Sequence, residues 1–284
     1  METILEEPEQ EPNAKLMNYF RRNTIVLYIL TNCPNGQCST NYTLSLVHTI
    51  ELMRKLNIRL YIEYTMNEKT SIRAKNNLIA KAMSNKDMTH MIFIDSQVSW
   101  NPWDIIKLVV SEKDVIGGAC PIGKYEWSVL TGNTDDRNMI KDYMKKRDNS
   151  HINNVSDELM LTSILTSYDL NISGSHLEVE NNICKINHIG SNFLLIRRQA
   201  IMRLFEKYPD KKYMDTTGYL QNDEVNYSYA LFDCEIKNGH FFKEDRVFCE
   251  RWKQLGSSVY LDISISLKLQ DPEEFCGSFM LALL

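Results

Sequence analysis

The chain has 284 residues, 43% of them apolar and 24% charged, and a formal net charge of −5. This length and composition are those of a globular α/β protein with a sizeable core, and they exclude fibrous and fully disordered classes. Net acidity without a basic stripe argues against nucleic acid as a main partner.

The chain lacks an apolar run of ~18 residues and an N-terminal signal-peptide pattern, so we expect no membrane span. Its seven cysteines contain no CxxC pair and show no zinc-ligand spacing, which predicts reduced thiols in a cytoplasmic protein.

In chain order, residues 1–15 are acidic and predict a disordered tail ahead of one domain over 16–284. Strand and helix patterns then alternate. The expected strands cover 24–30, 58–64, 91–94 and a short run from 115 to the glycine pair 117–118, and the expected helices cover 42–56, 71–83 and 102–110. This stretch, 24–122, predicts a Rossmann-like, nucleotide-binding half.

The rest of the chain has fewer helices. Residues 123–182 predict an irregular insertion with a helix near 136–147 and an apolar segment at 159–165. The half from 183 to 284 predicts a mixed sheet, with strands at 186–196 (broken at 190–191), 227–236 and 259–267, and helices at 199–208 and 245–255.

Asp95, Ser96 and Gln97 directly follow the apolar strand that ends at Ile94. In open α/β sheets, ligands bind beyond the carboxyl ends of the strands, where a carboxylate suits a metal-bound diphosphate or a sugar hydroxyl. The alternative is an aspartate that simply starts a turn.

Glu244 and Asp245 open the predicted helix at 245–255. Acids in the first turn of a helix are favoured by its dipole, so capping is one interpretation. The other makes Asp245 a general base that accepts a hydroxyl proton. Capping accounts for one acid better than for two.

Arg73 and Lys75 lie at the start of the helix expected over 71–83, where free N–H groups favour anions, although surface cations are the simpler interpretation. Gly117 and Gly118 allow either close ligand approach or a tight turn. We interpret the histidines as structural because they show no metal-ligand spacing.

Taken in order, the motifs resemble viral and phage glycosyltransferases of the GT-A fold over residues 24–277, most weakly across 123–182. The resemblance is carried by YILTNCPNG, SIRAKNNLIAKAM, HMIFIDSQVSWNPWDIIKLV, VIGGACPIGKYEW, IGSNFLLIRRQAI, YALFDCEIKNGHFFKEDRVFCERWKQLG and VYLDISISL. It implies transfer of a sugar from a nucleotide-diphosphate donor, usually with a divalent cation.

The resemblance also implies roles for single residues. Thr31 would face the nucleotide base, Arg73 the donor phosphates or base, and Asp95, Ser96 and Gln97 would stand at the family's DxD motif. Gly117 and Gly118 would line the donor side, and Gly190 the acceptor side. Glu244 and Asp245 would match the family's acid pair, with Asp245 as base.

Two departures concern the metal. Gln97 stands where the family has an acid, and the histidine that often follows the last strand is absent from Leu267–Asp271. Fewer anionic ligands weaken a Mn²⁺ or Mg²⁺ site built on Asp95 and Gln97. Three alternatives stay open: the donor phosphates hold the metal together with Asp95, Arg73 and Lys75 replace it, or the enzyme is impaired.

We therefore expect a transferase that moves a sugar from a UDP-sugar to a glycan acceptor by inversion. The alternative is a degenerate relative that binds nucleotides or glycans without turnover. A sugar-nucleotide pyrophosphorylase is a third hypothesis, although the chain lacks that class's glycine- and arginine-rich phosphate loop. Its Asn-, Ile- and Lys-rich composition together with the resemblance suggests a large DNA virus, and hence the host cytoplasm or a virus factory.

Overall fold

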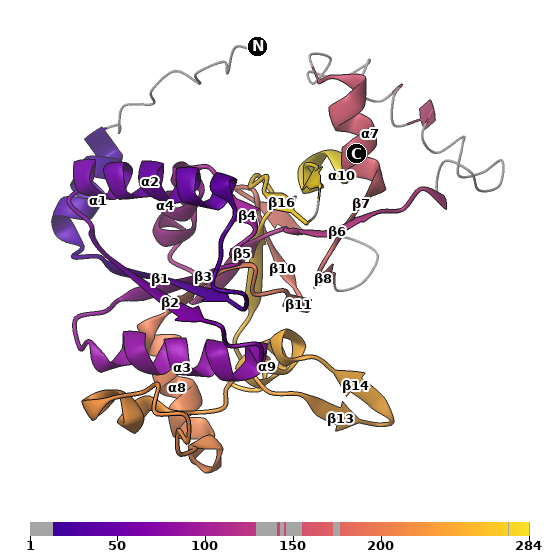
Figure 1. Ribbon diagram of the computed structural model, residues 1–284. Helices are drawn as coiled ribbons and strands as arrows, with labels where there is room; N and C mark the ends of the chain where they lie inside the picture. The colour runs from indigo at the N-terminus through magenta and orange to yellow at the C-terminus, as the bar shows by residue number, and fades with distance from the viewer. Residues whose placement is uncertain are drawn as a thin grey trace.

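The computed structural model describes residues 14–128, 141–142, 145, 155–172, 177–271 and 273–283 (Figure 1). Its centre is a mixed sheet of eight strands in the order β2-β1-β3-β12-β5-β15-β10-β9. The strands are β1 (Val26–Cys33), β2 (Arg59–Met66), β3 (His90–Ile94), β5 (Val115–Gly118), β9 (Val179–Glu180), β10 (Ile183–Ile186), β12 (Phe193–Arg197) and β15 (Val259–Asp262).

β1, β2 and β3 are parallel, and β12 lies antiparallel between β3 and β5. Since β15 is parallel to β5, the strands β1, β2, β3, β5 and β15 point the same way, and their carboxyl ends share one edge of the sheet. The reversed β12 begins at this edge, so the loop that precedes it lies beside the end of β3.

Helices cover both faces of the sheet. Figure 1 shows α1, α2 and α4 on one face and α3, α8 and α9 on the other. Their bounds are α1 (Ala14–Arg22), α2 (Thr40–Lys55), α3 (Ser71–Ser84), α4 (Pro102–Val110), α8 (Arg198–Lys207) and α9 (Glu244–Lys253).

Two apolar cores result, one on each face. Alternation along β3 places Met91 and Phe93 in the core under α3, α8 and α9, and Ile92 and Ile94 in the core under α2 and α4. The start of α4 is as expected: the Asn101 side chain accepts the Trp103 N–H at 3.0 Å, and a proline follows at the first helical position.

Smaller elements surround the sheet. β16 (Lys268–Gln270) pairs with β4 (Val98–Ser99) on one side and with β17 (Glu274–Cys276) on the other. Three two-stranded pairs are β6 (Pro121–Tyr125) with β7 (Thr166–Tyr168), β8 (Leu170–Asn171) with β11 (His188–Ile189), and β13 (Glu235–Lys237) with β14 (His240–Phe242). The remaining helices are α7 (Asp157–Leu165), α10 (Phe279–Ala282), and the 3₁₀ turns η1 (Pro209–Lys211) and η2 (Asn222–Tyr227).

Most expected elements are present, with shifted ends. The break at 190–191 is confirmed, since β11 and β12 flank it. β1 extends three residues beyond the expected end, to Cys33, and α1 was not expected. The strand expected at 259–267 is shorter and ends at Asp262, as β15. The Asp262 carboxylate accepts both the N–H and the hydroxyl of Ser264 and so forms a turn. The helix expected at 136–147 lies outside the described residues except at 141–142 and 145.

The prediction of a strand at 227–236 is wrong. Between η2 and β13 the chain forms an irregular segment, residues 228–234. An isolated antiparallel bridge joins Tyr229 to Lys212, and side chains satisfy further backbone groups of the segment. Arg251, which is 3% exposed, donates to the carbonyls of Ala230 (2.7 Å) and Leu231 (3.1 Å). The side-chain amide of Asn76 bonds both the N–H (3.0 Å) and the carbonyl (2.8 Å) of Phe232.

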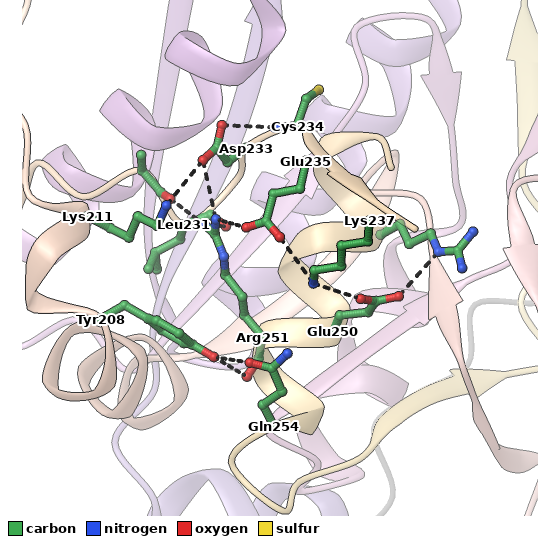
Figure 2. A network of polar contacts seen from close by, with 12 residues as sticks. Tyr208, Lys211, Leu231, Asp233, Cys234, Glu235, Lys237, Glu250, Arg251 and Gln254 are labelled. Carbon is green, nitrogen blue, oxygen red and sulfur yellow. Dashed lines mark hydrogen bonds and ion pairs between the residues drawn. The ribbon is translucent and has the colours of Figure 1, made fainter. Parts of the chain in front are cut away.

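Figure 2 shows Arg251 at the centre of this network, where it also donates to Asp233 (3.3 Å) and Glu235. Because the buried guanidinium of Arg251 donates to two backbone carbonyls and two carboxylates, it holds the 228–234 segment against α9. The segment in turn holds the ring of Phe232 beside α3.

Candidate functional site

Asp95 lies at the carboxyl end of β3, as expected. Its N–H donates to the carbonyl of Asn192 in the loop before β12 (3.0 Å), and its Oδ1 accepts the N–H of Gln97 (2.9 Å). Burial raises the pKa of Asp95, while the Gln97 N–H and the charge of Lys75 act against that shift.

Glu244 and Asp245 form the first turn of α9, and both are bonded to Lys75 of α3. The ammonium of Lys75 lies 3.2 Å from Oε1 of Glu244 and 2.8 Å from Oδ1 of Asp245. The Ser71 hydroxyl adds a bond to Glu244 at 3.1 Å. The lysine, glutamate and aspartate side chains are only 13%, 18% and 16% exposed, so the contacts are largely shielded from solvent.

The 228–234 segment also contacts Lys75, through the ring of Phe232. Its ammonium lies 5.3 Å from the centroid of the Phe232 ring, a cation–π contact. Burial works to lower the pKa of Lys75, but Asp245 and Glu244 outweigh it and the pKa is raised. Lys75 therefore carries its positive charge at neutral pH.

Asp169, between β7 and β8, is a further acid on this edge. Its carbonyl accepts the Gly190 N–H at 2.8 Å, and a Cβ at position 190 would lie 2.8 Å from its carboxylate. Burial, and then the charge of Asp245, raise the pKa of Asp169, while Lys75 opposes the shift. Lys75 thus acts electrostatically on Asp95 and Asp169 as well as on the acid pair.

Asp95, from the first half of the chain, and Asp245, from the second, are related through Lys75. This lysine bonds to Asp245 and acts on Asp95 through its charge. The resulting cluster of Lys75, Asp95, Asp169, Glu244 and Asp245 is called the acid–lysine cluster below.

Other residues singled out from the sequence lie nearby with partners of their own. Thr31 is fully buried in β1, and its hydroxyl is 2.7 Å from that of Tyr42. Arg73 forms a two-point ion pair with Glu68 (2.6 and 3.0 Å) on the surface of α3. The Ser96 carbonyl accepts the N–H of Ser39 at 2.9 Å, ahead of α2.

The three glycines are positions of close packing. A Cβ on Gly117 would lie 2.6 Å from the carbonyl oxygen of Phe193, and one on Gly118 would lie 2.6 Å from the side chain of Ile265. Gly190 makes room for the carboxylate of Asp169. Packing against the Phe193 backbone requires glycine at 117, while a side chain at 118 or 190 would have to displace Ile265 or Asp169. The roles of the three glycines toward a ligand stay predictions.

Sequence reasoning missed Asp169 and treated His188 as structural. Burial lowers the pKa of His188, Asp169 works against that shift, and Arg246 and Lys253 reinforce it. Asp169 falls in the insertion expected at 123–182, which carries no periodic pattern. No local pattern marks Asp169, because the charges of Asp245 and Lys75 that act on it come from elements far away in the chain.

The described side chains do not by themselves fit a resident divalent cation. No group of three or more His, Cys, Asp or Glu residues in the described part of the chain is arranged to hold a metal ion. At the end of β3, Asp95 has one oxygen bonded to the Gln97 N–H and Lys75 as its neighbouring cation. Mn²⁺ and Mg²⁺ require about six oxygen ligands, more than this edge supplies.

In the ranges that the structure describes, no helix combines the length and apolarity needed to cross a bilayer.

No protein-family model matches this chain, and no curated protein does. Among solved structures it is similar to one titled "Crystal Structure of A197 from STIV", with 13% identity, a TM-score of 0.41, and coverage of 87% of this chain and 86% of that one. A TM-score of 0.41 is too low to assign a fold family. By its topology, the protein is a mixed α/β domain with a large mixed sheet.

Proposed function

We propose that this protein is a glycosyltransferase of the GT-A type that moves a sugar from a UDP-sugar to a glycan acceptor. The supporting observation is the acid–lysine cluster, because Lys75 bonds to the helix-start acids of one half and its charge acts on the strand-end aspartate of the other. That arrangement offers a donor side and an acceptor side at a single edge of the sheet.

The proposed reaction is an in-line displacement with inversion. The acceptor hydroxyl oxygen forms a bond to the anomeric carbon while the bond from that carbon to the diphosphate breaks. Asp245 takes the hydroxyl proton, and UDP leaves with the bonding electrons. Asp95 would orient the donor, and Lys75 would stabilise negative charge on the leaving diphosphate. Arg73 and Gln97 would contribute side chains to the donor side, while Thr31, Ser96 and the three glycines, which are buried, would support the walls from behind.

A Mn²⁺ or Mg²⁺ ion would then arrive with the diphosphate, since the protein supplies few ligands. When bound, it would add positive charge at the leaving group. Transfer with and without added Mn²⁺ separates this option from one in which Lys75 supplies the charge.

The test is release of UDP from a panel of UDP-sugars, in wild type and in Asp245→Asn. We expect the variant to lose on the order of 100-fold or more in turnover, which is the usual contribution of a general base. Asp223→Asn, in the exposed first turn of η2, is the matched control and should behave as wild type. No release from any donor, or equal rates in both proteins, would contradict the proposal.

A second candidate is a binding protein without turnover. It is favoured by the ion pair between Asp245 and Lys75, because in the free protein this pair already occupies the carboxylate of the proposed base. Calorimetric binding of UDP-sugars that is unchanged in Asp245→Asn, with no UDP released, would establish this function instead.

A further inference from the structure

A polar cavity lies alongside the acid–lysine cluster, on another face of α9. Its volume is about 250 Å³, several times the roughly 30 Å³ that one water occupies in the liquid. It is lined by Asn171, Asn187, His188, Arg246, Glu250 and Lys253. We propose that it binds an anionic group, a carboxylate or a sulfate, carried by the acceptor glycan; this rests on the proposed function.

One wall of the cavity is a stripe of α9. Arg246, Glu250 and Lys253 are spaced by four and three residues, which puts them on one side of the helix. Asp245 precedes Arg246 and turns instead toward Lys75. A ligand in the cavity would therefore lie against the same helical turn that carries the proposed base.

The opposite wall is the pair of short strands β8 and β11. His188 and Asn171 are antiparallel partners, and the Asn187 side chain donates to that of Asn171 at 2.8 Å. His188 is close enough to Asp169 and Asp245 for both charges to act on it. This wall presents amide and imidazole groups, which suit an oxygen-rich ligand.

The charge balance of the cavity is positive. Glu250 is its one acid, and its two oxygens are bonded to Arg246 (3.4 Å) and to Lys237 (3.2 Å), the latter pair visible in Figure 2. Arg246 is also held over the Phe242 ring at 3.6 Å. In the part of the chain that the structure describes, Lys253 has no ion-pair partner.

An anion would therefore meet Lys253 directly, with Arg246 and His188 at its sides. The whole chain carries a net charge of −5, so a cavity with two cations, Arg246 and Lys253, around one doubly paired acid is a local exception. Such a field selects an acidic ligand over a neutral one of the same shape. The acceptor would be a glycan with an acidic residue near the hydroxyl that reacts.

The test is a titration of the His188 ring resonances by NMR, without any donor. The probes are glucuronate, inorganic sulfate and, as the neutral match, glucose. We expect saturable shifts with an anion and none with glucose. Lys253→Gln should weaken the anion at least about tenfold, the effect of losing one charged hydrogen bond. Lys207→Gln is the control, because Lys207 is likewise the last residue of its helix, α8.

Binding of glucuronate points to a carboxylated acceptor, and binding of sulfate alone to a sulfated one. No saturable shift with either anion, or equal affinity in Lys253→Gln and wild type, would overturn the site. UDP release, measured on the same preparations, reports separately on the transferase. Glucuronate binding without UDP release would support the anion site and contradict the proposed transferase. UDP release without binding of either anion would support the transferase and contradict the anion site.

Discussion

At the scale of one residue, the ionised carboxylate of Asp95 lowers the free energy of unfolding. Its carboxyl is partly buried, and its pKa is raised from the ordinary value of 3.8. The folded protein therefore holds this proton more tightly than the unfolded chain does. Ionisation of Asp95 costs stability as the pH rises from 3.8 through the folded-state pKa, and the cost persists at neutral pH.

We expect Asp95→Asn to be more stable than wild type at pH 7, because the amide keeps an oxygen for the Gln97 N–H and removes the buried charge. The gain should shrink as the pH falls toward 4, where wild type is protonated as well. Thermal unfolding of both proteins across this range measures it. A variant that is less stable at pH 7, or a gap that does not depend on pH, would contradict the expectation. Donor affinity should fall in the same variant.

Lys75 and Glu244 have the opposite effect on stability. Burial raises the pKa of Glu244, but Lys75 and nearby donors outweigh it, so that the pKa is lowered from 4.5. The stability that this pair contributes is present above pH 4.5 and is lost as the pH falls through the folded-state value. The Lys75 pKa is raised, so its own contribution is lost only at strongly basic pH.

At the scale of elements, α9 joins the site to the core through Arg251. The same helix carries Glu244 and Asp245 at its start and a buried arginine two turns later, and that arginine fixes the segment that positions Phe232 under Lys75. The geometry of the acid–lysine cluster therefore depends on a network that touches no ligand.

Arg251→Met should lower the free energy of unfolding by about 3 kcal/mol, since it leaves two carbonyls and two acids without their shared cation. Urea unfolding measures this, and hydrogen exchange should show faster amide exchange across 229–235. Arg203→Met is the matched control: its guanidinium lies over the same helix, 4.7 Å from the Trp252 ring, but is 43% exposed. Equal losses in the two variants would show that the network has no special role.

The sequence predicted the alternating first half well, because its strands and helices are local patterns with clear starts. The position of β12 between β3 and β5 could not be predicted, since strand pairing joins residues about a hundred positions apart. For the same reason the sequence showed Lys75 only as a cation near a helix start. Its bonds to Glu244 and Asp245 span 169 and 170 positions, and no local pattern records them. The irregular 228–234 segment was mistaken for a strand because its apolar residues face the core, while the decisive partners, Asn76 and Arg251, are remote.

For the molecule as a whole, the two apolar cores share the strands between them. β3 and β12 supply alternate residues to each core, so neither core can unfold while the other keeps its central strands.

We expect one cooperative transition, reported alike by a variant that keeps only Trp100, in the core under α2 and α4, and by one that keeps only Trp252, in the core under α9. In each variant the other tryptophans are changed to phenylalanine. Urea midpoints from fluorescence should coincide with those from far-ultraviolet circular dichroism of the same protein. Separate midpoints within either variant would mean that the two halves unfold independently.

The bond between Lys75 and Asp245 also has a consequence for synthesis of the protein on the ribosome. When a growing chain has just completed β3, it carries Lys75 and Asp95, but 150 further residues must be added before Asp245 is made. Until then the ammonium lacks Glu244 and Asp245, the two acids that bond to it, so α3 should stay loosely docked. The cluster can close only near the end of translation, which means that a nascent or prematurely terminated chain would carry Lys75 and Asp95 without the acid pair of α9.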